Sequence, residues 1–360
     1  MSVLTDIIKA EIAGSGVISF ARFMELALYC PDCGYYETEN VTVGRHGDFY
    51  TSVSVGSLFG ELLAFQFARG MEQISSSKVQ IVEAAAHDGK LALDILRGLK
   101  RCRPDVFERV EYQILEPSAR RRAWQEKALA EFSSVVRWQN AGKIESEQTV
   151  CGVIFANELL DAMPVHRLGW NAQQRAWFEW GVSWEGGKFA WAKMGASVES
   201  AKLNLLPDEL LTVLPDGFTT EICTAAQEWW SNAARVLKVG RLVTLDYGFH
   251  NEAGLSPNHP NGTLRAYHNH KVSEDVLAQP GEQDITAHVE FHSIQSAGES
   301  AGLQTEMFAS QSSFLTRLAS EMMNAGTDSA MWTPQKSREL QTLIHPEHLG
   351  RAFNVLVQTR

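Results

Sequence analysis

Short apolar runs alternate with stretches of helical periodicity over most of the chain, which is the pattern of an α/β protein. The pattern is clearest at residues 79–96, where an apolar run is followed by a loop of small residues and then by apolar residues at helical spacing. Comparable apolar runs lie at residues 110–115, 135–138, 152–156, 241–245, 305–308 and 353–358. The sequence therefore predicts an open parallel sheet whose strands are joined by helices.

Two parts of the chain depart from this alternation. The N-terminal part has helical periodicity, and its stretch 56–71 is apolar almost all round, which indicates a buried helix. Residues 165–193 contain short alternating runs and predict an inserted β-hairpin, whose four tryptophans either pack in a core or line a surface. We therefore expect an N-terminal helical region with a loop that covers the site (1–75), a sheet domain (76–164 and 219–360) and an inserted β-rich, partly irregular region (165–218).

The loop after the first strand has the composition of a nucleotide-binding turn. Glu83 ends the strand, and small residues lead through His87 to Gly89 at the start of the helix. Small side chains let the backbone approach a ligand, and a helix start offers free N–H groups. Glu116 ends the second strand, where an acidic residue can accept hydrogen bonds from two ribose hydroxyls. An ordinary strand–helix connection explains the loop equally well.

The fourth strand carries the strongest candidate site. It ends in Asn157 and Glu158, and Asp161 follows three residues later. Ligands of open parallel sheets bind at the carboxyl ends of the strands, so an amide and two carboxylates there indicate a polar binding site. The simpler alternative is that Asn157 caps a helix whose first turn carries both acidic residues.

The composition is that of a globular, acidic protein. The 360 residues are 44% hydrophobic and 21% charged, with a formal net charge of −11. The absence of a long basic block argues against nucleic acid as the main partner. No apolar run reaches the roughly 18 residues of a membrane span, and the N-terminal residues have neither signal-peptide nor transit-peptide composition. Five scattered cysteines favour a reducing compartment, and we expect a cytoplasmic protein.

Cys30 and Cys33 form a CxxC pair. A zinc site would need a second ligand pair, and the sequence has no second CxxC and no paired His/Cys cluster. A redox pair would belong at a helix N-terminus that follows a strand. We therefore expect these two cysteines to be structural, and we expect no metal site.

Seven further segments form an ordered series along the chain: 34–36, 47–52, 59–61, 157–166, 246–248, 262–265 and 284–289. In this order and spacing they resemble the motifs of the MidA-type class I S-adenosylmethionine-dependent methyltransferases, whose mitochondrial members act in respiratory complex I assembly. The resemblance spans nearly the whole chain. Each motif is modest alone, but the series is specific.

The resemblance implies a seven-stranded Rossmann-like sheet, S-adenosylmethionine as cofactor, and methylation of an arginine side chain in a partner protein, with a homodimer left open. Cofactor binding would fall to the strand ends, with Glu83 near the amino group and Glu116 on the ribose. A guanidinium needs carboxylates that bind it as a fork, and our candidates come from two loops. The expected site is thus Glu158, Asp161 and Asp48 for catalysis, and Glu83, Ala85, His87, Gly89, Glu116 and Asn157 for the cofactor.

Two departures from the family pattern leave alternatives open. Ala85 and His87 stand where the family has the first two glycines of its loop, and Val53-Ser54 replaces a proline and a glutamate. The first alternative is therefore a catalytically weak or inactive relative that acts as a binding or assembly factor. The second, a nicotinamide-dependent oxidoreductase, is disfavoured because the loop lacks the glycine that lets a pyrophosphate approach. We predict a working methyltransferase.

Overall fold

The structure, a computed structural model, describes residues 2–38, 51–139, 149–203, 206–250, 255, 258–268, 271–325, 332–346 and 349–360. Its largest element is an eight-stranded sheet. The strands are β2 (Val79–Ala84), β3 (Val110–Leu115), β4 (Val136–Gln139), β5 (Val150–Asn157), β10 (Leu237–Phe249), β14 (Val289–Glu290), β15 (Gln304–Ser310) and β16 (Phe353–Thr359).

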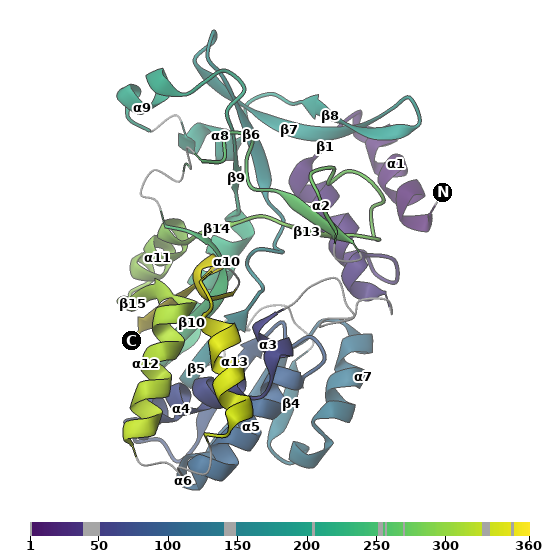
Figure 1. The fold of residues 1–360 in the computed structure, drawn as a ribbon. Coiled ribbons are helices and arrows are strands. Elements are labelled where there is room, and N and C mark those ends of the chain that lie inside the picture. Colours follow the sequence, from purple (N-terminus) through teal and green to yellow (C-terminus); the bar gives the residue numbers. More distant parts are fainter. Residues whose placement is uncertain are drawn as a thin grey trace.

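Seven of these strands form one hydrogen-bonded path in the order β15-β16-β10-β5-β2-β3-β4, and the short β14 pairs with β10 (Figure 1). The pairs along β4, β3, β2, β5 and β10 are all parallel. Only β16 runs antiparallel to its two neighbours, β10 and β15. The predicted seven-stranded, Rossmann-like sheet is confirmed, and its parallel strands bring their carboxyl ends to one edge.

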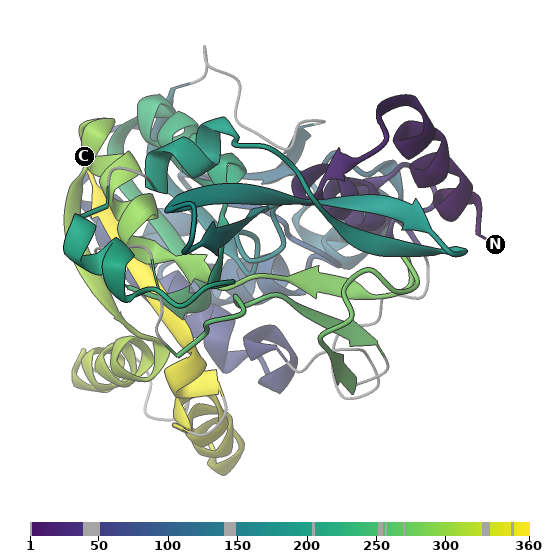
Figure 2. The ribbon, with the colours of Figure 1, turned by 90° about the horizontal axis from the view of Figure 1, so that it is seen from above.

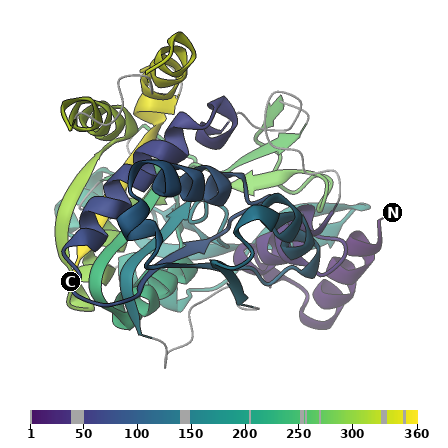
Figure 3. The same cartoon turned by 90° about the horizontal axis from the view of Figure 1, so that it is seen from below.

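Alternating side chains of each strand supply a separate core on each face of the sheet. Ile81 packs on the face covered by helices α4, α5, α12 and α13, whereas its neighbour Val82 packs on the face covered by α10 and α11. Figure 3 shows α4 and α5 together on the first face. The bounds are α4 (Leu58–Glu72), α5 (Lys90–Cys102), α10 (Thr224–Val236), α11 (Phe291–Ser300), α12 (Gln311–Asn324) and α13 (Pro334–Ile344).

A second, antiparallel sheet lies beyond the carboxyl edge of the main sheet (Figures 1 and 2). It contains the expected hairpin, β7 (Ala176–Glu185) and β8 (Lys188–Lys193), together with β1 (Ile18–Ser19), β6 (His166–Asn171) and β9 (Thr219–Ile222). Trp170 and Trp177 are buried in a core under this sheet, with residues of α8 (Val198–Leu203) and α9 (Asp208–Val213). Core packing is thus the role of Trp177 within the hairpin.

The N-terminal helices divide between the two sheets. Helices α1 (Val3–Ser15) and α2 (Phe20–Tyr29) pack against the second sheet, where Phe20 contacts Trp191 and Phe23 contacts Phe189. Helix α4, in contrast, belongs to the core of the main sheet. The chain between them includes the short helices η1 (Tyr35–Glu37) and α3 (Ser52–Val55). The N-terminal region therefore contributes helices to the cores of both sheets.

A small third sheet lies at the same edge. It consists of β11 (Arg265–His268), β12 (Lys271–Ser273) and β13 (Asp284–Thr286) from the loop-rich segment after β10. The remaining helices are α6 (Pro104–Phe107), α7 (Ala119–Ala128), η2 (Ala130–Phe132) and α14 (Leu349–Ala352). Among the described helices, none combines the length and apolarity that crossing a bilayer requires.

Candidate active site

The loop after β2 has a glycine-like backbone although two of its residues carry side chains. Ala85, His87 and Gly89 have φ angles of +62°, +47° and +82°, so alternate residues are in the left-handed region. Only glycine adopts this region without steric cost; other residues lose about 1–2 kcal/mol there. The loop therefore keeps the shape that the missing glycines would give, at the expense of local strain.

A pocket of about 870 Å³ lies where the carboxyl ends of β2, β5 and β10 face the third sheet. Most of the expected site residues line this pocket: Glu83, Ala85, His87, Asn157, Glu158 and Asp161. Gly89 and Glu116 are not among its lining residues, and Asp48 lies outside the described part of the chain. The structure thus brings together candidates that are far apart in the sequence.

Glu83 is a buried carboxyl group at the end of β2, with 1% of its surface exposed. It accepts a hydrogen bond of 2.7 Å from the hydroxyl of Tyr112 in the adjacent strand. Burial raises the pKa of Glu83 to about 8, because desolvation outweighs the hydrogen bond. A ligand cation at this point would favour the ionised carboxylate.

Glu116 lies after β3 and is connected to the loop through one side chain. Its Oε1 accepts a 2.9 Å hydrogen bond from the backbone N–H of Ser118, and its Oε2 accepts a 2.8 Å bond from Nε2 of Gln125. The same Nε2 donates to the carbonyl oxygen of His87 at 3.0 Å. Gln125 therefore holds Glu116 and the strained loop in a fixed relation.

The segment after β5 is a turn, and the alternative of a helix capped by Asn157 is wrong. Glu158 has a φ of +54°, and its N–H bonds to the carbonyl of Leu245 in the neighbouring strand. Asp246 Oδ2 accepts the N–H groups of Leu159 and Leu160 at 3.2 and 2.8 Å. Asp246, for which no role was predicted, thus fixes this turn, whose residues Glu158 and Asp161 line the pocket.

Three further carboxyl groups line the pocket: Glu158, Asp161 and Asp284. Burial and the nearby charge of Asp161 raise the pKa of Glu158 to about 8. Burial also raises the pKa of Asp161, which is close to Asp246. Asp284 accepts a 3.0 Å hydrogen bond from the hydroxyl of Tyr36. Carboxyl groups that share a partly desolvated pocket in this way attract a cation.

Asp284 and Tyr36 were missed as individual site residues. Both belong to segments in the ordered motif series, 284–289 and 34–36, so the signal was present without a role attached to it. Glu61, from a third such segment, lies elsewhere: it contacts Lys336, and its Oε2 is 3.0 Å from Nη2 of Arg101. Glu61 therefore neutralises cations between helices and does not line the pocket.

Two polar atoms of the pocket residues fit a bound ligand. Nε2 of His87 and Oδ1 of Asn157 are buried, and neither has a hydrogen-bond partner among the described residues. Buried polar atoms are nearly always paired, so such atoms beside a pocket indicate groups that a ligand satisfies. A cofactor with a carboxylate, an ammonium group and hydroxyls has suitable partners here.

Comparisons with known proteins agree with this geometry. The family model described as "Putative S-adenosyl-L-methionine-dependent methyltransferase" matches residues 62–309. The mitochondrial protein arginine methyltransferase NDUFAF7 of Danio rerio is 27% identical, over 96% of this chain and 84% of its own length. The NDUFAF7 homolog of Drosophila melanogaster is also 27% identical, over 82% of this chain and 70% of its own length.

The expectation of a cytoplasmic protein is contradicted, because these relatives are mitochondrial by name. It rested partly on the cysteines, and free thiols indicate only a reducing environment and do not distinguish one such compartment from another.

A crystal structure also matches this chain in three dimensions. A Burkholderia thailandensis protein bound to S-adenosyl-homocysteine is 31% identical, with a TM-score of 0.86, over 99% of this chain and 92% of its own. The fold, the ligand-compatible pocket and these matches agree on S-adenosylmethionine as the cofactor. The chain therefore belongs to this family of S-adenosyl-L-methionine-dependent methyltransferases.

Proposed function

We propose that the protein methylates an arginine side chain of a partner protein. The observation that carries this proposal is the group of carboxyls on the substrate side of the pocket, Glu158, Asp161 and Asp284. A guanidinium is a planar cation with five N–H donors, and paired carboxylates match it in both charge and shape. The names of the mitochondrial relatives support the same substrate class.

We assign the cofactor to the other side of the pocket. Glu83 would accept the ammonium group, and Nε2 of His87 would donate to the carboxylate, since both residues line the pocket beside the β2 loop. Oδ1 of Asn157 would accept a further donor. We assign the ribose to Glu116, which is joined to this loop through Gln125. Gly89 is the N-cap residue directly before α5, and its left-handed φ closes the loop.

The chemistry asked of the protein is mainly positioning. When bound, S-adenosylmethionine supplies a methyl group that its sulfonium already activates. Glu158 and Asp161 would hold the guanidinium as a fork, which aligns one nitrogen and removes much of the entropic cost of the encounter. An ionised Glu158 can also take the proton that the methylated nitrogen must release. The fixed turn supplied by Asp246 keeps both carboxylates in place.

The loop geometry argues against the inactive alternative. Ala85 and His87 retain left-handed backbones, so the substitutions leave the course of the loop intact. The proposal includes the expected division into three regions and a possible homodimer. Limited proteolysis and ultracentrifugation would address them.

The test measures S-adenosyl-homocysteine formation by the purified protein with S-adenosylmethionine and a library of peptides that contain either arginine or lysine. We expect turnover with arginine peptides only, at least a hundredfold slower in Glu158→Gln. Glu185→Gln is the matched control, because Glu185 is an exposed carboxylate outside the pocket. Equal turnover of lysine peptides, or full activity in Glu158→Gln, would contradict the proposal.

A further inference from the structure

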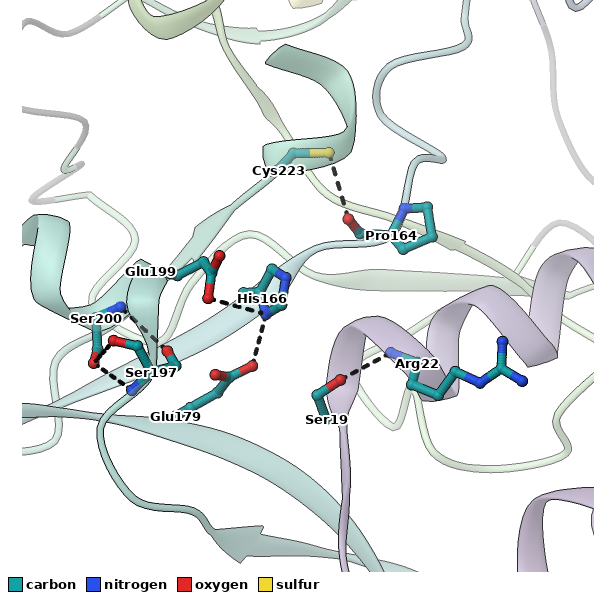
Figure 4. A network of polar contacts seen from close by, with 9 residues as sticks. All are labelled: Ser19, Arg22, Pro164, His166, Glu179, Ser197, Glu199, Ser200 and Cys223. Carbon is teal, nitrogen blue, oxygen red and sulfur yellow. Dashed lines mark hydrogen bonds and ion pairs between the residues drawn. The ribbon is translucent and has the colours of Figure 1, made fainter. Parts of the chain in front are cut away.

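A histidine and two glutamates from three elements converge within the second sheet, away from the residues that line the pocket. His166 begins β6, Glu179 lies in β7 and Glu199 lies in α8. Nδ1 of His166 is 2.7 Å from Oε1 of Glu179 and 4.0 Å from Oε2 of Glu199 (Figure 4). The three potential ligand atoms all lie within 4.8 Å of one another.

The single histidine of this group cannot neutralise both of its carboxylates. Glu179 is 4% exposed, and a carboxylate that is buried to this degree requires hydrogen bonds or a nearby cation. The Nδ1–H of one imidazole can donate to Glu179, but at 4.0 Å the Glu199 oxygen is beyond hydrogen-bond distance. Two carboxylates therefore point at one nitrogen that can serve only one of them. A divalent cation at this point would compensate both.

Outer hydrogen bonds hold the two glutamates in place. The backbone N–H of Ser197 donates to Oγ of Ser200 at 2.8 Å, and the N–H of Ser200 donates to Oγ of Ser197 at 3.2 Å. These reciprocal bonds fix the first turn of α8, which carries Glu199 (Figure 4). Ser197 also forms a side-chain hydrogen bond with Glu179. Metal ligands are oriented by partners of this kind, which are ready here before any ion binds.

We propose that His166, Glu179 and Glu199 form a binding site for a divalent transition-metal ion, with zinc and manganese as the best candidates. An imidazole nitrogen and carboxylate oxygens are ligands of such ions, and three protein ligands leave positions for water. The ion would join β6, β7 and α8. His166 follows Asp161 by five residues. A bound ion would therefore also restrain the end of the turn that carries Glu158 and Asp161.

The test begins with protein freed of metal by a chelator and titrated with zinc chloride or manganese chloride in a calorimeter. We expect one ion per chain, a raised melting temperature, and at least tenfold weaker binding in His166→Gln and in Glu199→Gln. Glu199→Gln lies in the short helix α8 and keeps the test valid if His166→Gln fails to fold. Glu185→Gln, a carboxylate in the same strand as Glu179, should bind metal like the wild type.

The thiols of Cys30 and Cys33 are 3.2 Å apart and offer a competing zinc site, so the double variant Cys30→Ser/Cys33→Ser is measured as well. Retained binding in this variant supports the proposal. The proposal is overturned if the double variant loses metal binding while His166→Gln retains it. It is also overturned if the wild-type protein binds neither ion at about 100 µM. S-adenosyl-homocysteine affinity, measured in parallel, should stay unchanged in Glu199→Gln, so the result is independent of the proposed methyl transfer.

Discussion

Replacement of Glu83 by glutamine should change how the stability of the protein depends on pH. The folded protein keeps this buried carboxyl protonated up to a pKa of about 8, because burial disfavours its charge. In the unfolded chain the same group ionises near its ordinary value, roughly 4.3. The stability that Glu83 contributes is therefore complete below the unfolded pKa and is lost as the pH rises through the folded pKa.

The size of the effect follows from proton linkage. Well below the folded pKa only the folded state holds the proton, so the free energy of unfolding falls by about 1.4 kcal/mol for each pH unit. The slope halves at the folded pKa itself, so the loss between pH 6 and pH 8 is roughly 2.3 kcal/mol. Glutamine retains an oxygen that can accept the Tyr112 hydroxyl but carries no titrating proton. Glu83→Gln should therefore lack this loss, although Glu158 still contributes its own.

The assay is urea unfolding of wild type, Glu83→Gln and the control Glu185→Gln at pH 6 and pH 8.5. The wild type should lose roughly 2–3 kcal/mol more than Glu83→Gln between the two pH values, and the control should follow the wild type. If wild type and Glu83→Gln lose equal free energy, Glu83 is already ionised at pH 6 in the folded protein. Burial would then not control the charge of this carboxyl group.

Three further predictions concern the loop, the turn and the substrate carboxylate. Ala85→Gly should alter the free energy of unfolding by less than about 1 kcal/mol, because relief of left-handed strain offsets the added freedom of the unfolded chain. Ala85→Val should lower it by about 2 kcal/mol; urea unfolding compares the two variants, and equal stabilities would show that the loop is not strained. Asp246→Ala leaves the N–H groups of Leu159, Leu160 and Tyr247 without their acceptor, so the free energy of unfolding should fall by about 3 kcal/mol. Thermal and urea unfolding measure this, and a fall below about 1 kcal/mol would count against the role of Asp246 in the turn. With an arginine peptide, kcat/KM should rise up to about pH 8, since a guanidinium binds ionised Glu158; a flat profile from pH 6 to pH 8 would contradict this.

The sequence predicted seven of the eight strands of the main sheet, because each of the seven contains a short apolar run; the two-residue β14 was not predicted. Their carboxyl ends also predicted where the polar residues would meet, since parallel strands end at one edge. Glu83 and Glu158 illustrate this: they are distant in the sequence and line the same pocket. The local sequence pattern was therefore sufficient to place residues that lie at the carboxyl end of a parallel strand.

The pattern was insufficient where position depends on distant backbone. Strand β9 was not predicted, because its partner β6 lies far earlier in the chain. The turn at Glu158 could be confused with a capped helix, because the hydrogen bonds that decide it come from Asp246, far along the chain. Asp284 reaches the pocket only through the third sheet. Such contacts depend on tertiary structure, which periodicity does not encode.

The shared amide of Gln125 has a consequence for ligand affinity. Its Nε2 atom donates hydrogen bonds both to the carboxylate of Glu116 and to the carbonyl of His87. A ligand that binds the carboxylate of Glu116 therefore also changes how firmly Gln125 holds the loop after β2. The two halves of a long ligand would then bind with a coupling free energy, and the effect must be reciprocal. Adenosine bound at one end should thus alter the affinity for methionine at the other, and Gln125→Ala should make the two sites independent.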